Sequence, residues 1–152
     1  MAVSIHNHNG GEKIISIKIF EEMLSSVDNL KSPFVRGGTP QIRSEILDRL
    51  SKYGWSSQVL IDSGSKISIT GMLGDVALCV QTGNMSRFYA DLLKLQYLYK
   101  KNRVKSAFYV IYTNTAAKQV GDNVANFERF VAELIMFKEI VTIPMVVIGF
   151  EK

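Results

Sequence analysis

The sequence predicts an α/β fold in which a mixed β-sheet, built from an antiparallel meander and a strand that follows a crossover helix, is flanked by helices. Three short segments with β character lie between residues 57 and 82, and their connections are short and glycine-rich, as hairpins require. An amphipathic segment at 86–101 then leads to residues 106–113, whose continuous apolar character is typical of a strand buried on both faces. Tight hairpins give antiparallel pairs, whereas a helix between two strands permits parallel pairing, so the sheet should be mixed.

Length and composition indicate one globular domain over residues 1–152. Of these residues 47% are hydrophobic, and no apolar run approaches the roughly 18 residues that a membrane span needs. The only cysteine, Cys79, excludes an intramolecular disulfide and suits a reducing cytoplasm. Residues 1–12 lack a signal-peptide pattern and are expected to form a flexible tail, so that His6 and His8 belong to a disordered end rather than to a metal site. The formal charge of +4 permits nucleic-acid binding without requiring it.

Two helices are expected before the first β segment. Apolar residues recur at helical spacing in residues 17–30, although 14–20 alone could also form a strand. In the next segment the pair Gly37–Gly38 provides a flexible turn, Thr39 can cap a helix and Pro40 suits its first position. The apolar face of this second helix consists of Ile42, Ile46, Leu47 and Leu50.

The remaining elements follow from the same periodicities. Alternating or continuous apolar residues indicate strands, and apolar residues at intervals of three and four indicate helices. The polar segment 113–123 is interpreted as a loop. The expected strands are 57–62, 66–70, 75–82, 106–113 and 143–150, and the expected helices are 86–101 and 123–137.

Three residues could form a site at the edge of the meander. Cys79 and Gln81 are two positions apart on one strand and therefore share a face. Asp62 ends the preceding candidate strand, where a hairpin neighbour would bring it beside them. Acidic oxygens from two adjacent strands are what a Mg²⁺ site for phosphodiester hydrolysis needs, because the ion stabilises the anionic transition state and activates water.

The runs "LID" and "GDVALCVQTGNMSRFYADLLKLQYLYKKNRV" resemble the core of the PD-(D/E)XK restriction endonucleases, and within them the BamHI and BglII group. The upstream segment "RGGTPQIRSEILDRLSKYGW" is similar to the glycine-rich turn and helix that precede this core. The closing segment "NVANFERFVAELIMFKEIVTIPMVVIGF" resembles the last helix and strand of the family. The resemblance extends over most of the chain from about residue 35 and implies a restriction-endonuclease-like fold.

The same resemblance implies Mg²⁺-dependent hydrolysis of duplex DNA by a homodimer. Asp62 matches the family aspartate, and Gln81 matches the second acid or glutamine of the strand, so these two residues would hold the metal. Cys79 stands where the family has its essential glutamate, and a soft, mostly protonated thiol is a poor Mg²⁺ ligand. Catalysis would then be weak or absent, and the alternative is an inactive pseudo-nuclease that binds DNA or a protein. The alternative for Cys79 itself is packing inside a strand.

Other residues have two interpretations each. Glu45 could join the catalytic site from its helix, or form an ion pair with Arg49 four residues later. Tyr89 and Tyr99 on the helix 86–101 could belong to the core or to a homodimer interface. Residues expected to bind DNA, with solvated surface as the alternative, are Arg36, Lys66 and Lys118.

Overall fold

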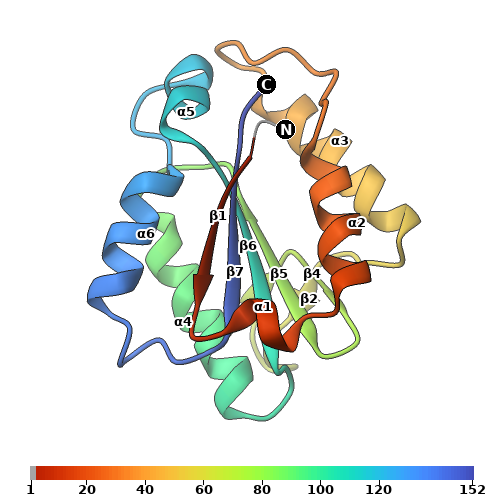
Figure 1. The fold of residues 1–152 in the computed structure, drawn as a ribbon, viewed down its shortest axis with the longest axis vertical. Coiled ribbons are helices and arrows are strands. Elements are labelled where there is room, and N and C mark those ends of the chain that lie inside the picture. The colour runs from red at the N-terminus through yellow and green to blue at the C-terminus, as the bar shows by residue number, and fades with distance from the viewer. Residues whose placement is uncertain (1–2) are drawn as a thin grey trace.

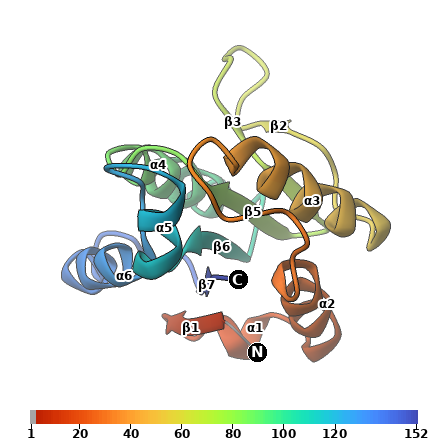
Figure 2. The same ribbon diagram turned by 90° about the horizontal axis from the view of Figure 1, so that it is seen from above.

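The computed structural model describes residues 3–152 and contains a five-stranded mixed sheet between two layers of helices (Figures 1 and 2). The strand order is β1-β7-β6-β5-β4. The three central strands are mutually parallel, while β1 and β4 pair antiparallel at the two edges. The predicted mixed α/β fold is therefore confirmed. The strands are β1 (Val3–His8), β4 (Gly71–Leu73), β5 (Val76–Gln81), β6 (Ser106–Tyr112) and β7 (Met145–Phe150).

Helices cover both faces of this sheet because the central strands are apolar on both sides. Alternate residues of β5 face opposite layers, with Leu78 in one apolar cluster and Cys79 in the other. Helices α2, α3 and α5 contribute to the first cluster, and α4 and α6 to the second. The helices are α1 (Gly11–Ile14), α2 (Ile17–Val27), α3 (Thr39–Lys52), α4 (Arg87–Lys100), α5 (Asn114–Val120) and α6 (Phe127–Met136).

The three β segments predicted between residues 57 and 82 divide differently from the expectation. Strands β2 (Val59–Leu60) and β3 (Ser68–Ile69) pair only with each other and form a separate hairpin that projects from the body (Figure 2). The antiparallel neighbour of β5 is instead β4, which was predicted to be a connection. The hairpin packs Ile69, which is 3% exposed, against the apolar cluster beneath α4, whereas Leu60 and Ile67 remain 46% and 50% exposed. It forms a two-stranded sheet of its own.

The prediction of a flexible N-terminal tail is wrong for residues 3–12. All six residues of β1 pair with β7, from Val3 opposite Phe150 to His8 opposite Met145, and α1 follows. The side chain of His8 is 3% exposed, and its Nε2 lies 2.6 Å from the carbonyl oxygen of Val141. Strand β7 would otherwise present an open edge, and pairing satisfies its backbone groups. Only residues 1–2 of the predicted tail lie outside the described residues.

Three local features bear on the predictions: one decides between two alternatives, and two differ from what was expected. Residues 14–20 do not form a strand, because Ser16 caps α2 by accepting a hydrogen bond from the amide of Ile19. Thr39 is the first residue of α3 rather than its cap, and its hydroxyl lies 2.9 Å from the Tyr112 hydroxyl at the end of β6. The expected loop at 113–123 contains α5, which Thr113 caps.

We expect His8 to make folding stability depend on pH. Burial lowers the pKa of His8 below its ordinary 6.5, His6 and Lys138 act in the same direction, and the hydrogen bond to Val141 opposes them. A histidine with a lowered folded-state pKa contributes stability that is fully present above 6.5 and is lost as the pH falls below that value. Urea unfolding of His8→Gln should show a smaller loss of stability on acidification than wild type, with a residual slope from His6. Identical pH profiles would contradict this.

Candidate active site

A cleft of about 870 Å³ opens beside β5, where the short strand β4 ends. Strand β4 pairs with Val76–Leu78 alone, so the last three residues of β5 have no strand partner on that side of the described sheet. Side chains replace the missing strand at Val80. Its amide donates to the Thr70 hydroxyl at 2.9 Å, and its carbonyl accepts from the Arg43 guanidinium. Buried backbone groups need such partners, and here they bring two polar side chains to the cleft.

A buried polar network lies beneath the cleft, between β5, β6 and α4. The Gln81 amide donates to Oδ2 of Asp91 at 2.6 Å, and the Tyr109 hydroxyl donates to the same oxygen at 2.7 Å. Burial raises the pKa of Tyr109 well above its ordinary value, and the nearby Asp91 charge adds to this, so the phenol stays a donor. Lys94 lies 3.6 Å from the other oxygen of Asp91 and compensates its charge. Oδ2 of Asp91 thus accepts two hydrogen bonds and Oδ1 faces the Lys94 ammonium, so this buried carboxylate is held by its own neighbours.

Cys79 is a packed, neutral thiol. It is 2% exposed and belongs to the apolar cluster beneath α4 and α6. Burial raises its pKa well above the ordinary value and the Asp91 charge adds to this, while Lys94 and Arg43 act in the opposite direction. A buried, protonated thiol is neither a nucleophile nor a useful ligand for a hard metal ion. The packing interpretation of Cys79 agrees with this environment.

The structure does not bring Asp62 to Cys79 and Gln81, so the predicted adjacency is wrong. Asp62 lies in the turn of the projecting β2–β3 hairpin, where its Oδ1 accepts a hydrogen bond from the Gly64 amide at 3.1 Å. It borders a different hollow, next to Tyr97 and Arg103. The position beside Cys79 in the β4–β5 register is instead Thr70, because Gly71 pairs with Leu78. The expectation failed because it assigned the hairpin strand, rather than β4, as the neighbour of β5.

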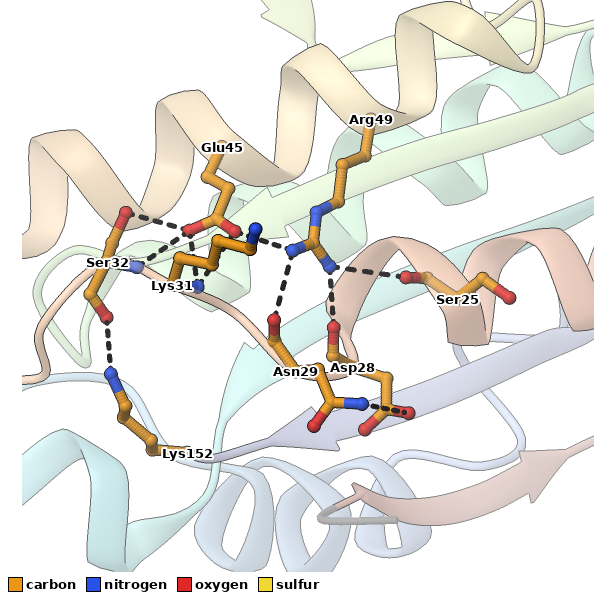
Figure 3. A network of polar contacts seen from close by, with 8 residues as sticks. All are labelled: Ser25, Asp28, Asn29, Lys31, Ser32, Glu45, Arg49 and Lys152. Atoms are coloured by element: carbon orange, nitrogen blue, oxygen red, sulfur yellow. Dashed lines mark hydrogen bonds and ion pairs between the residues drawn. The ribbon is translucent and has the colours of Figure 1, made fainter.

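Glu45 also lies away from the cleft, in a cluster that joins α3 to the α2–α3 connection (Figure 3). Its carboxylate accepts hydrogen bonds from the amides of Lys31 and Ser32 at 2.9 to 3.0 Å and pairs with Arg49 at 2.6 Å. Partial burial acts to raise the pKa of Glu45, but these hydrogen bonds and the Arg49 charge outweigh it and lower the pKa. The predicted ion pair with Arg49 is therefore present. Glu45 does not line the cleft beside β5, where a catalytic role would require it.

The three cations expected to bind DNA occupy different places. Arg36 precedes α3 and forms an exposed ion pair with Asp122 at 2.8 Å. Lys118 lies exposed on α5, which follows the carboxyl end of β6. Lys66 belongs to the projecting hairpin and borders a groove toward α4. Arg36 and Lys118 are thus near the carboxyl ends of the parallel strands, where ligands of open α/β sheets commonly bind, and Lys66 is not.

Five residues of the cleft and of the buried network beneath it were not predicted as site residues from the sequence. Asp91 had a usable signal, since a charged residue stands among Phe88, Leu95 and Leu98 at the spacing of the buried face of α4. The apolar side expected from the sequence consists of Tyr89, Leu92, Leu93, Gln96 and Tyr99. The buried face of α4 is rotated from it, since Leu93 is 74% exposed. Thr70, Arg43, Lys94 and Tyr109 gave no comparable signal, because their roles depend on contacts between distant elements. The five residues are Arg43, Thr70, Asp91, Lys94 and Tyr109.

Comparison with known families shows to which family the chain is related. Residues 3–150 match the family described as restriction endonuclease BglII/BglIII. The chain belongs to this family. The resemblance to the BglII group is thereby confirmed, although no curated protein matches the chain at a significant level.

Two solved structures show how far the fold is shared. The restriction endonuclease BglII in complex with a DNA 16-mer superposes with a TM-score of 0.83 at 16% identity, covering 100% of this chain and 77% of the other. Free BglII superposes with a TM-score of 0.74, also at 16% identity, covering 100% of this chain and 80% of the other. At such low identity the superpositions show the fold.

The donor set of this BglII/BglIII family member does not fit the Mg²⁺ ion that the resemblance implies. Mg²⁺ requires oxygen ligands in nearly octahedral geometry. Cys79 offers a protonated sulfur, the Gln81 carbonyl oxygen accepts the Gly83 amide at 2.9 Å, and the oxygens of Asp91 are engaged. Across residues 3–152 no three His, Cys, Asp or Glu side chains lie close enough to share a metal ion. The assignment of Mg²⁺ to Asp62 and Gln81 is not supported by the structure.

We expect Cys79→Glu alone to bind Mg²⁺ weakly at most, because the nearby Asp91 carboxylate is already held by Gln81, Tyr109 and Lys94. Thr70 directly precedes β4 and lies opposite Cys79 when the β4–β5 register is continued by one residue, so the double variant Thr70→Asp/Cys79→Glu adds two facing carboxylates and should bind the ion. Calorimetric titration with MgCl₂ measures this, and Thr70→Asn/Cys79→Gln is the neutral control of matched size. Tight Mg²⁺ binding by wild type or by Cys79→Glu would show that Asp91 or another group completes a site.

Proposed function

We propose that this BglII/BglIII family member binds duplex DNA without hydrolysing it efficiently. The observation that supports this most directly is the composition of the cleft beside β5. It has the cations Arg43, Arg87 and Lys94 against two carboxylates, of which Asp91 is buried and hydrogen-bonded and Asp48 lies exposed on α3. Phosphodiester hydrolysis needs accelerations toward the upper end of roughly 10⁶ to 10¹⁷. A site with a neutral thiol and no free carboxylate at this strand is not equipped to supply them.

Several features favour DNA as the partner. The family relative BglII forms a complex with a DNA 16-mer, and the sheet of this chain superposes on it over its full length. The chain has a formal charge of +4. Both α5 and the start of α3 lie at the carboxyl end of the parallel strands (Figure 1). Lys118 belongs to α5, and Arg36 precedes α3 and pairs with Asp122 after α5. Backbone phosphates are the sequence-independent target of such cations.

The proposal also retains two coarser expectations. No helix among residues 3–152 has the length and apolar character to cross a membrane. A reducing cytoplasmic setting remains our prediction, since Cys79 is a free, buried thiol. A magnesium-dependent nuclease is the competing function, and cleavage of DNA would decide in its favour.

We expect wild-type protein to bind mixed-sequence duplex DNA and to leave it uncut in the presence of Mg²⁺. The logarithm of the binding constant should fall linearly with the logarithm of salt concentration, by roughly 0.9 for each phosphate neutralised. Fluorescence anisotropy measures the binding, and gel electrophoresis after long incubation measures cleavage. Absence of binding at low salt would overturn the proposal of DNA binding. Efficient Mg²⁺-dependent cleavage would establish the competing function.

A homodimer is the second part of the proposal, with the outer face of α4 as the contact. Tyr89, Leu93 and Tyr97 recur at intervals of four and therefore form one stripe, and they are 39%, 74% and 36% exposed. Tyr99, which was expected to share this interface, is instead partly buried against the core. Two copies related by a twofold axis would present the same stripe to each other. The two strands of a DNA duplex are themselves related by a twofold axis, so a twofold dimer would contact both strands in the same way.

Leu93→Glu is expected to shift the protein from dimer to monomer, because each interface would lose two apolar side chains and gain two like charges. A buried leucine contributes about 1.5–3 kcal/mol, so the dissociation constant should rise by a factor of ten or more. Light scattering coupled to size-exclusion chromatography measures the mass. The matched control is Ile17→Glu, at an apolar residue that is 77% exposed on α2. A wild-type monomer at micromolar concentration, with and without DNA, would contradict the proposal.

A further inference from the structure

Two cations reach the cleft from opposite walls. Arg43 extends from α3 and donates one hydrogen bond to the Val80 carbonyl at the open edge of β5. Lys94 extends from α4 and lies 3.6 Å from Asp91, with its side chain 25% exposed. Both line the same cleft as Thr70 and Cys79. They therefore flank the open end of β5 from either side.

Arg43 has hydrogen-bonding capacity that its own protein does not use. A guanidinium has five N–H donors, and the only acceptor that Arg43 contacts among the described residues is the Val80 carbonyl. In the part of the chain that the structure describes, no carboxylate lies within ion-pair distance of it. Burial lowers the pKa of Arg43, as expected for a cation held in a partly desolvated wall. An arginine in this state favours an anionic ligand with several oxygens.

The charge at the open end of β5 is opposite to that of a metal site. Arg43 and Lys94 both act electrostatically on the Cys79 thiol, which marks their proximity to this strand end. The lining of the cleft has three cations, Arg43, Arg87 and Lys94, against the carboxylates of Asp48 and Asp91, so its formal charge is positive. Asp91 is buried and takes up part of the Lys94 charge, whereas Arg43 has no carboxylate partner among the described residues. A phosphate placed at the open end of β5 would therefore be attracted, mainly by Arg43 and with a contribution from Lys94.

We propose that Arg43 and Lys94 bind a backbone phosphate of the DNA directly, in the place where a metal ion would bridge protein and phosphate. This inference deepens the proposed DNA binding and rests on it. The site takes a phosphodiester without any divalent ion. Its contribution to affinity therefore does not require Mg²⁺ and persists in a chelator.

The test is fluorescence anisotropy of a labelled 16-base-pair duplex with the full chain, at constant ionic strength, with MgCl₂ or with EDTA. Wild-type binding should persist in EDTA and be no weaker there than in MgCl₂, because Mg²⁺ itself competes for the DNA phosphates. Arg43→Gln and Lys94→Gln should each weaken binding about ten-fold and reduce the salt slope by roughly one, the loss expected for one phosphate contact. Lys94→Arg should retain binding, since it preserves the charge. The matched controls are Arg129→Gln on α6 and Lys18→Gln on α2, whose side chains are 55% and 86% exposed.

Each outcome has a separate meaning. Wild-type protein that does not bind the duplex at low salt overturns both the proposed function and this inference. Wild-type protein that binds, with Arg43→Gln and Lys94→Gln no weaker than the controls, overturns this inference alone. Binding that needs Mg²⁺ and disappears in EDTA also overturns it. If the loss of the Val80 contact unfolds Arg43→Gln, which thermal melting detects, the comparison of Lys94→Gln with Lys94→Arg decides the matter.

Discussion

The open edge of β5 is the feature on which the cleft depends. Strand β4 ends after pairing with the first half of β5, and the backbone of Val80 then needs partners that a strand no longer supplies. Thr70 and Arg43 satisfy its amide and carbonyl, so the edge stays accessible without leaving buried polar groups unpaired. A longer β4 would close the cleft and remove Arg43 from the strand. The same interruption that weakens the sheet therefore creates the site.

Below that edge, the polar contacts centre on one buried carboxylate, Asp91. Asp91 binds Gln81 and Tyr109 through short hydrogen bonds and faces Lys94, so its role is to hold α4 against β5 and β6. A buried carboxylate needs such compensation because desolvation of the isolated charge would cost several kcal/mol. These contacts compete with a metal for its oxygens. The lining of the cleft has three cations against the two carboxylates Asp48 and Asp91, so its formal charge is positive.

The position of Arg43 depends in turn on a cluster on the other side of α3. Glu45 and Arg49 bind backbone groups of the preceding connection, including the Lys31 amide and the Asp28 carbonyl, the latter at 2.5 Å (Figure 3). These contacts fix α3 against α2, and the buried Ile46 packs the same helix on the sheet. Helix α3 thus has one polar face that binds the α2–α3 connection, and it presents Arg43 to the cleft. Glu45 stabilises this wall of the cleft without lining the cleft itself.

The sequence by itself determined the central strands, most helices and the family relationship, because continuous or periodic apolar residues encode these elements locally. It also identified Cys79 as the departure from an acidic site. Tertiary structure alone decided that Asp62 lies in a separate hairpin and that Thr70 borders β5 in its place. It also decided that the polar segment 3–8 forms an edge strand. Strand neighbours depend on which apolar faces are buried across the whole chain, and for weakly apolar segments such as these no local pattern specifies the partner.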